Sequence, residues 1–331
     1  MFFFLLLFSC FPYTLQAHVF HYSFTKLNLP SMGSEAYAFD SKGGGPYTGL
    51  NDGRIVKYQG PRIGFVDFAF TSANRSKKLC DGEVPDDNVG LAIKCGRPIG
   101  LELNHKTGDL YILDAFRGLM VVGPQGGIAT QLSKGMDGVP IDVPDAIDVD
   151  PVTGTVFYTD IGPAILKFKN ITAFLLSGDT SGRLLKYDPK TRQRTVVLRG
   201  LSGPNGVAVS KDGTFVLVSE YVAGRIRKIW LKGPKANSSE ILVNLPGSPD
   251  NIKRTSSGDF WVPVNIARLL PKKTTFPLAQ KFNSDGQILE TVNFYAEYND
   301  IYITEVHEHL GSLYVASIYT NFVGVFRRLA C

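Results

Sequence analysis

Gly258-Asp259-Phe260-Trp261-Val262 joins a turn glycine to an apolar and aromatic run, and similar stretches recur along the chain. Glycine allows the positive φ of a tight hairpin turn, and the residues after it suit a half-buried strand. The other stretches are Asp52-Gly53-Arg54-Ile55-Val56, Gly108-Asp109-Leu110-Tyr111-Ile112, Gly154-Thr155-Val156-Phe157-Tyr158, Gly213-Thr214-Phe215-Val216-Leu217 and Gly311-Ser312-Leu313-Tyr314-Val315. Their glycines lie 55, 46, 59, 45 and 53 residues apart. These repeats, with no long helical pattern, predict an all-β, six-bladed β-propeller with a central channel.

The composition is that of an ordinary globular protein. Of the 331 residues, 44% are hydrophobic and 20% are charged, and the net charge is +5. The lysine pairs Lys77-Lys78 and Lys272-Lys273 are isolated, so no basic patch predicts a nucleic-acid partner. We expect a monomer whose partner is a small organic molecule.

The first residues resemble a secretory signal. The apolar run MFFFLLLFSCFP, residues 1–12, is too short to span a bilayer, and Leu15-Gln16-Ala17 is a plausible cleavage site. The alternative is a buried N-terminal strand. We predict a signal peptide over residues 1–17, a single propeller over 18–331 without a membrane span, and a location in the secretory pathway, either vacuolar or extracellular.

Cysteines and sequons agree with that location. Cys80 and Cys95 flank a polar loop, and in an oxidising compartment a disulfide between them would stabilise the fold by about 3 kcal/mol. A zinc site is disfavoured because no histidine or second cysteine pair is near, and Cys331 is left over. Glycosylation is predicted at three sequons, Asn74, Asn170 and Asn237.

One segment interrupts the rhythm of strands and turns. Residues 161–178, IGPAILKFKNITAFLLSG, are interpreted as a short helix or a lid loop between blades.

Acidic and amide side chains recur where blades are expected to start. In a propeller the innermost strands line the channel, so side chains from distant blades can converge there. Oxygen ligands without histidine or cysteine favour a hard cation such as Ca²⁺. Any one of these residues alone is better explained by the tolerance of Asn and Asp for a turn backbone, but four of them at matching blade positions favour a metal site. The candidate ligands are Glu35, Asp145, Asn205, Asp250 and Asn251.

Common motifs of nucleophilic, metalloprotease and phosphate-binding sites are missing. The sequence has no Gly-x-Ser-x-Gly elbow, no His-Glu-x-x-His and no phosphate-binding glycine loop.

At this point the sequence resembles the strictosidine synthase-like family of plant six-bladed propellers, from about Gly33 onward. The resemblance implies a secreted or vacuolar protein of specialised metabolism such as alkaloid biosynthesis, a loop disulfide matching Cys80–Cys95, and a channel that binds small organic substrates. The residues that carry it are Ser34-Glu35-Ala36, Tyr47-Thr48-Gly49, Asp52-Gly53-Arg54, Gly64-Phe65-Val66-Asp67-Phe68-Ala69, Cys95-Gly96-Arg97-Pro98, Asp137-Gly138-Val139-Pro140, Thr159-Asp160, Gly182-Arg183-Leu184-Leu185-Lys186-Tyr187-Asp188-Pro189 and Glu308-His309-x-Gly311.

The family's namesake joins tryptamine to secologanin by a Pictet–Spengler condensation. Its essential glutamate lies four residues before the Glu of Glu-His-x-Gly, a position that is Thr304 here. A threonine hydroxyl is no base near neutral pH. Glu305 follows, but neighbouring strand residues face opposite ways, so it would need a bulge to substitute. The threonine at the position of the essential glutamate argues against strictosidine synthesis.

A more distant resemblance links the chain to the calcium-dependent propeller hydrolases paraoxonase, gluconolactonase and diisopropyl fluorophosphatase. It implies metal ligands at Glu35, Asn205, Asp250 and Asn251, with Asp145 in place of their usual asparagine. The ion would polarise a carbonyl or phosphoryl oxygen as a Lewis acid. Asp250, or a water molecule that it orients, would then be the nucleophile or base. A paraoxonase histidine is replaced by Ile99, so a histidine-assisted mechanism is not implied.

The leading hypothesis is therefore a calcium-dependent ester or lactone hydrolase acting on a small organic molecule. An amine–aldehyde condensing enzyme that uses Glu305 and a non-catalytic binding glycoprotein are the alternatives.

Overall fold

The computed structural model describes residues 22–82, 88–133, 135–136, 139–163, 165, 171–268 and 274–329. The predicted signal peptide, Asn170 and Cys331 lie outside these residues.

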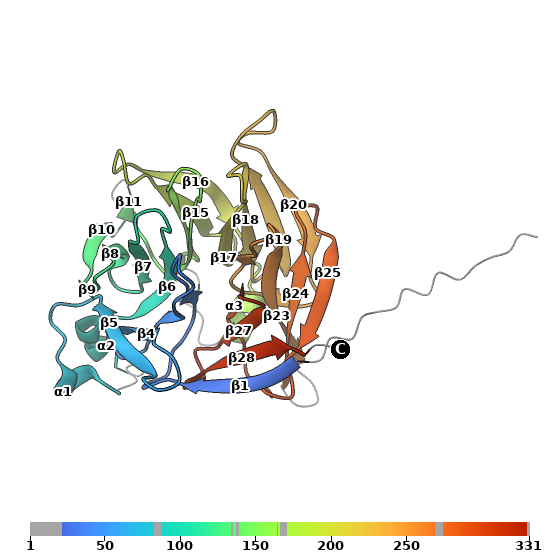
Figure 1. Cartoon of the computed structure of the whole chain (residues 1–331). Coiled ribbons are helices and arrows are strands. Elements are labelled where there is room, and N and C mark those ends of the chain that lie inside the picture. The colour runs from blue at the N-terminus through green and yellow to red at the C-terminus, as the bar shows by residue number, and fades with distance from the viewer. Residues whose placement is uncertain are drawn as a thin grey trace, which may run out of the picture.

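Six blades of antiparallel strands surround a central axis, as the sequence repeats predicted (Figure 1). Blade 1 contains β2 (Tyr37–Ala38), β3 (Tyr47–Gly49), β4 (Arg54–Tyr58) and β5 (Phe65–Phe70), and β9 (Gly127–Ile128) pairs with β5 in parallel. Blade 2 contains β6 (Pro98–Leu103), β7 (Leu110–Asp114), β8 (Gly118–Val122) and β10 (Thr130–Ser133). Blade 3 contains β13 (Pro144–Val149), β14 (Val156–Asp160), β15 (Gly182–Tyr187) and β16 (Arg194–Leu201).

The second half of the chain continues the pattern. Blade 4 contains β17 (Pro204–Val209), β18 (Phe215–Glu220), β19 (Arg225–Trp230) and β20 (Ser239–Asn244). Blade 5 has an inner strand in two pieces, β21 (Ser248–Pro249) and β22 (Lys253–Arg254), followed by β23 (Phe260–Arg268), β24 (Thr274–Phe282) and β25 (Ile288–Asn293). Blade 6 contains β26 (Glu305–His309), β27 (Ser312–Ala316), β28 (Phe322–Arg328) and β1 (Tyr22–Asn28). A small ribbon of β11 (Gly135–Met136) and β12 (Val139–Pro140) precedes blade 3.

The repeated turn glycines have the conformation that the sequence predicts, but one is out of phase. Five of them have positive φ and lie in the turn between the first and second strands of blades 2 to 6: Gly108, Gly154, Gly213, Gly258 and Gly311. Gly53, with φ 85°, instead lies between the second and third strands of blade 1. Each blade contains several tight turns followed by an apolar strand. The pattern therefore predicts the number of blades correctly, but it does not show which pair of strands in the blade the turn connects.

The hydrophobic core lies between the blades. Apolar clusters of described residues occur at all six junctions of neighbouring blades. Blades 4 and 5, for example, share Leu217, Ile226, Phe260 and Val262. Because both faces of each sheet are covered in this way, the second strands are buried along most of their length.

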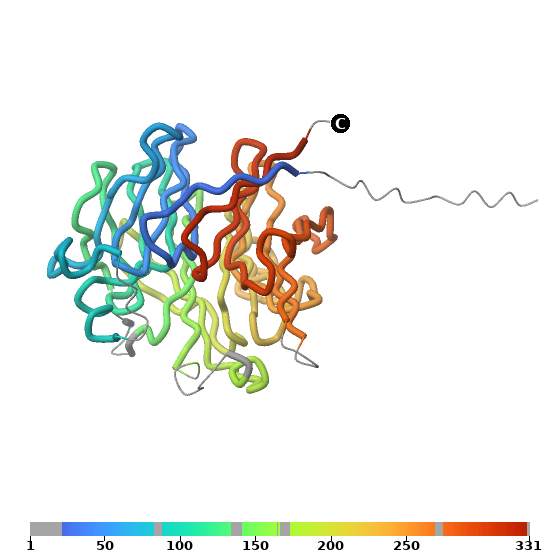
Figure 2. Tube along the Cα trace, turned by 90° about the horizontal axis from the view of Figure 1, so that it is seen from below, coloured from blue at the N-terminus to red at the C-terminus, as the bar shows by residue number. Residues whose placement is uncertain are grey.

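The ring is closed by its first and last strands. β1 pairs with β28 in antiparallel register from Tyr22↔Arg328 to Asn28↔Phe322, and the two lie side by side in blue and red (Figure 2). The Phe24 ring packs at 4.9 Å from that of Phe326.

A disulfide bond crosslinks the segment that connects blades 1 and 2. Cys80, at the end of α1 (Lys77–Cys80), is bonded to Cys95, at the end of α2 (Val89–Cys95), and both are buried. The predicted pairing is confirmed.

The interrupting segment 161–178 does not connect two blades. It joins β14 to β15 within blade 3, and its described part contains the short helix α3 (Ile171–Leu175). The helix is confirmed, and the placement between blades is wrong.

The two described sequons, Asn74 and Asn237, are exposed. Among the described residues, no helix has the length and apolar character needed to cross a membrane.

Ring closure can be tested at Phe24, on the inner side of β1. Phe24→Ala should lower the free energy of unfolding by about 2 kcal/mol, less than a fully buried phenylalanine, because Phe24 is half-buried. Thr25→Ala, on the exposed side of the same strand, should change it by no more than about 0.5 kcal/mol. Denaturant titration of both variants gives the comparison, and equal losses would contradict a closing role for the β1 inner side.

Candidate functional site

Three carboxyl groups from different blades meet near the axis. Glu35 precedes β2, Asp145 is the second residue of β13, and Asp250 follows β21. Each offers an oxygen atom, and these oxygens lie within 4.8 Å of one another. We call these three residues, together with Asn205 of β17, the carboxylate cluster. The structure therefore brings together residues that are up to 215 positions apart in the sequence.

Proline residues prepare the local backbone for three members of the cluster. Pro144, Pro204 and Pro249 immediately precede Asp145, Asn205 and Asp250. Proline cannot donate a ladder hydrogen bond, and the strand register shifts directly after Pro144 and after Pro204. Such irregularities re-aim a side chain.

A glycine lets two of these strands approach closely. A Cβ atom on Gly206 would lie 2.5 Å from the backbone oxygen of Asp250. The close approach allows Asn205 Nδ2 to donate a hydrogen bond to Asp250 Oδ1 at 3.3 Å. A glycine after Asn205 is therefore needed for the strands of blades 4 and 5 to pack closely at the site.

The cluster contains acceptor atoms that lack donors. Glu35 Oε2, Asp145 Oδ2 and Asn205 Oδ1 are buried and have no hydrogen-bond partner among the described residues. The Asn251 amide donates to Glu35 Oε1 at 2.9 Å, which orients that carboxyl group. Buried, unpaired acceptors are costly, so the cluster is suited to a group that brings positive charge or protons.

The raised pKa values of the three carboxyl groups agree with this requirement. Burial, followed by the charges of Asp145, Asp250 and Glu305, raises the pKa of Glu35 well above its usual value. Burial and then Asp250 do the same to the pKa of Asp145. Burial raises the pKa of Asp250 to about 7, although the hydrogen bond from Asn205 opposes the rise. Without a cation, the carboxyl groups would therefore retain protons at pH values where an exposed carboxylate is ionised.

Thr304 and Glu305 lie beside the cluster but point to different partners. Thr304 Oγ1 donates to the backbone oxygen of Glu35 at 2.7 Å. Glu305 Oε1 accepts from the backbone N–H of Tyr37 at 2.8 Å. β26 pairs regularly with β27 from Glu305 to His309, but the Thr304 backbone N–H also donates to the oxygen of Ala316, the residue opposite Glu305. Thr304 and Glu305 therefore both lie opposite Ala316, as in a β-bulge.

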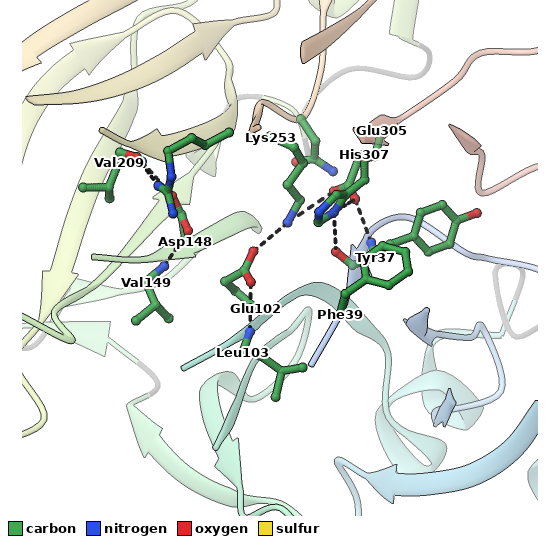
Figure 3. Close-up of polar contacts among 12 residues, drawn as sticks. Tyr37, Phe39, Glu102, Leu103, Asp148, Val149, Val209, Lys253, Glu305 and His307 are labelled. Carbon is green, nitrogen blue, oxygen red and sulfur yellow. Dashed lines mark hydrogen bonds and ion pairs between the residues drawn. The ribbon is translucent and has the colours of Figure 1, made fainter. Parts of the chain in front are cut away.

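Charges deeper along the axis are paired. Lys253 Nζ lies 2.9 Å from Glu102 Oε2 and 3.6 Å from Glu305 Oε2 (Figure 3). Burial alone would lower the pKa of Lys253, but Glu102, Glu305 and Asp148 raise it. Lys253 was not predicted from the sequence, because nothing in Asn251-Ile252-Lys253 indicates that the side chain enters the channel.

The channel is closed in its middle and open at the far mouth. Where residues of all six blades meet, among them Gly100, Val207 and Glu305, there is no room for a water molecule. Beyond Lys253, a cavity of about 270 Å³ is lined by residues that include Glu102, His105 and His307. The carboxylate cluster is therefore separated from this cavity.

Solved structures with a similar chain path support the fold. A gluconolactonase from Xanthomonas campestris aligns with a TM-score of 0.62 at 15% identity, covering 93% of this chain and 90% of that one. A luciferin-regenerating enzyme aligns with a TM-score of 0.62 at 14% identity, covering 94% and 96%. At such identities the likeness concerns the propeller alone.

Sequence relatives are much closer. The family model described as strictosidine synthase matches residues 145–234. Strictosidine synthase-like protein 12 of Arabidopsis thaliana is 43% identical over 308 residues, which are 92% of this chain and 90% of the relative. Strictosidine synthase of Catharanthus roseus is 36% identical over 307 residues, covering 90% and 84%. The chain belongs to the strictosidine synthase-like family.

Proposed function

We propose that the carboxylate cluster binds Ca²⁺ and that the protein is a calcium-dependent hydrolase of small organic esters or lactones. The single observation that carries the proposal is the convergence of Glu35, Asp145 and Asp250 within 4.8 Å, with buried oxygens that lack donors. The disulfide and the plant relatives favour a secreted or vacuolar protein of specialised metabolism.

A divalent cation fits the donors of the cluster. Ca²⁺ prefers six to eight oxygen ligands from carboxylates, amide carbonyls and water. Glu35, Asp145, Asp250 and the Asn205 carbonyl oxygen would hold it, while Asn251 orients Glu35. No sulfur or imidazole ligand belongs to the cluster, which disfavours zinc or copper.

The chemistry follows from that arrangement. A bound cation would supply Lewis-acid polarisation of the substrate carbonyl. Asp250 takes a proton from a water molecule as the water oxygen bonds to the carbonyl carbon. The acyl–oxygen bond then breaks, and Asp250 returns the proton to the departing alkoxide. The products are a carboxylic acid and an alcohol, or one hydroxy acid from a lactone.

A condensing activity is the second candidate, because the family includes the strictosidine synthase of Catharanthus roseus. In this protein Thr304 offers no carboxylate at the matching position. Glu305 is occupied by Tyr37 N–H and the Lys253 ammonium. An amine substrate would have to compete with both, which favours hydrolysis.

The first prediction concerns stability in the absence of metal. Asp250 has a folded-state pKa of about 7 against 3.8 for the ordinary carboxyl. A raised pKa contributes stability below the unfolded value that is lost as pH rises through the folded value. The Tm of chelator-treated protein should therefore fall between about pH 4 and pH 8 through this group.

Calcium should offset that loss. We expect added CaCl₂ to raise Tm more at pH 8 than at pH 5, because protons compete with the cation at the lower pH. Asp250→Asn should reduce both the pH dependence and the calcium effect, measured by scanning calorimetry. An equal calcium effect at both pH values, or none, would argue against the site.

The second prediction concerns activity on a panel of esters and lactones. Asp250→Ala should lower kcat/KM by at least about 100-fold, the usual contribution of a general base. Chelation should abolish turnover, and CaCl₂ should restore it. Asp285→Ala, an exposed aspartate of a β-turn, serves as the matched control and should leave kcat/KM unchanged.

The same assays separate the alternatives. Condensation would be favoured over hydrolysis if the protein formed a product from tryptamine and secologanin but did not cleave esters or lactones. The Glu305→Gln variant should then lose that product. Calcium binding without any turnover would indicate a binding glycoprotein.

A further inference from the structure

A pocket of about 430 Å³ lies between blades 4 and 5, beside α3. Its walls are the turn after β18, the segment between β20 and β21, and the end of β23. Leu175 and Leu176 add the end of α3 and the residue after it. All of these segments lie at the face of the ring where the carboxylate cluster is found.

Two segments of the pocket wall lie close to residues of the carboxylate cluster. Ser248, in the pocket lining, is two residues before Asp250 in the same inner strand. Val222, also in the lining, packs against Gly203, where an added Cβ would lie 2.9 Å from Val222 Cγ2. Gly203 is in turn two residues before Asn205. The pocket therefore begins within a few residues of two cluster members.

Tyr221 connects the pocket to the cluster. It is buried and immediately precedes Val222. Its backbone N–H donates to the Gly203 oxygen at 2.8 Å, which holds the turn after β18 against the start of β17. Burial, and then the charge of Asp250, raises the pKa of Tyr221 well above its usual value, as expected of a phenol close to that carboxyl group.

The pocket is lined by uncharged residues, and its exposed surface is divided almost equally between polar and apolar atoms. Among the described residues it contains no charged side chain, and its larger members are aliphatic. The amide of Asn265, one of its few polar residues, is already bonded in both directions to the backbone of Ile303. Leu176 is 76% exposed at the rim, so an apolar surface faces water unless a ligand covers it.

Small residues create the space. Ala223, Gly224, Gly247 and Ala267 line the pocket where larger side chains would fill it. Its volume is within the range of small-molecule sites.

We infer that this pocket binds the alkyl arm of the substrate, and that the substrates are esters or lactones with an alkyl chain that fits a pocket of about 430 Å³. The inference rests on the proposed function for the reacting end of the molecule. The carbonyl lies at the carboxylate cluster, and the chain runs past Tyr221 and Val222 into the pocket. Chain burial then contributes binding energy remote from the reacting bond.

The first test is a series of p-nitrophenyl esters from acetate to decanoate with the full-length processed protein. Burial of each methylene should raise kcat/KM roughly fourfold until the pocket is full. Ala267→Phe, which fills the pocket, should lower the octanoate-to-acetate ratio of kcat/KM at least tenfold. Leu176→Asp changes only an exposed position and should lower the same ratio. Ala236→Phe, in the exposed hairpin between β19 and β20, is the matched control and should leave the ratio unchanged.

The second test needs no turnover. Calorimetric titration with 2-butanone, 2-hexanone and 2-octanone measures binding of uncharged ligands that cannot be hydrolysed. Affinity should rise with chain length in the unmodified protein and lose that dependence in Ala267→Phe.

The outcomes distinguish the two proposals. Chain-length-dependent ketone binding that Ala267→Phe abolishes, without cleavage of any ester, supports the pocket and refutes the hydrolase. Ester cleavage without a chain-length preference refutes the pocket alone, as does a preference that Ala267→Phe and Leu176→Asp leave intact. Absence of both cleavage and ketone binding refutes both.

Discussion

The pairing of β1 with β28 is the constraint on which the rest of the molecule depends. Six sheets that each hide an apolar face can bury all of those faces only if the ring closes, and the last junction is completed by strands from opposite parts of the chain. The same junction places Glu35, whose backbone oxygen accepts from Thr304 in the neighbouring blade. A ring that did not close would therefore expose the core at this junction. It would also displace Glu35, one member of the carboxylate cluster.

Charge is distributed unevenly along the axis. At one end Glu35, Asp145 and Asp250 have no described basic partner at hydrogen-bond distance. Further along, Lys253 neutralises Glu102 and Glu305, although it is only three residues from Asp250 in the sequence. Isolated buried carboxylates are far more costly than paired ones, so the unpaired end of the axis is where an external cation gains most.

Much of the fold could be predicted because its signals are local. A glycine turn followed by an apolar strand recurs in every blade, although Gly53 shows that such a turn does not reveal which hairpin it belongs to. The cluster was also predictable, since the inner strands of a propeller share one axis and three of the residues follow a proline. The position of Lys253 and the pocket between blades 4 and 5 could not be predicted, because they depend on how loops from separate strands pack together.

The narrow middle of the channel separates the carboxylate cluster from the cavity beyond Lys253. Residues of all six blades meet there, and the gap between them is too small for a water molecule. Reactants and products of the proposed reaction would therefore enter and leave the cluster on the side of the ring away from that cavity. The loops on that side could limit how fast products leave, and their sequences can vary without disturbing the ring.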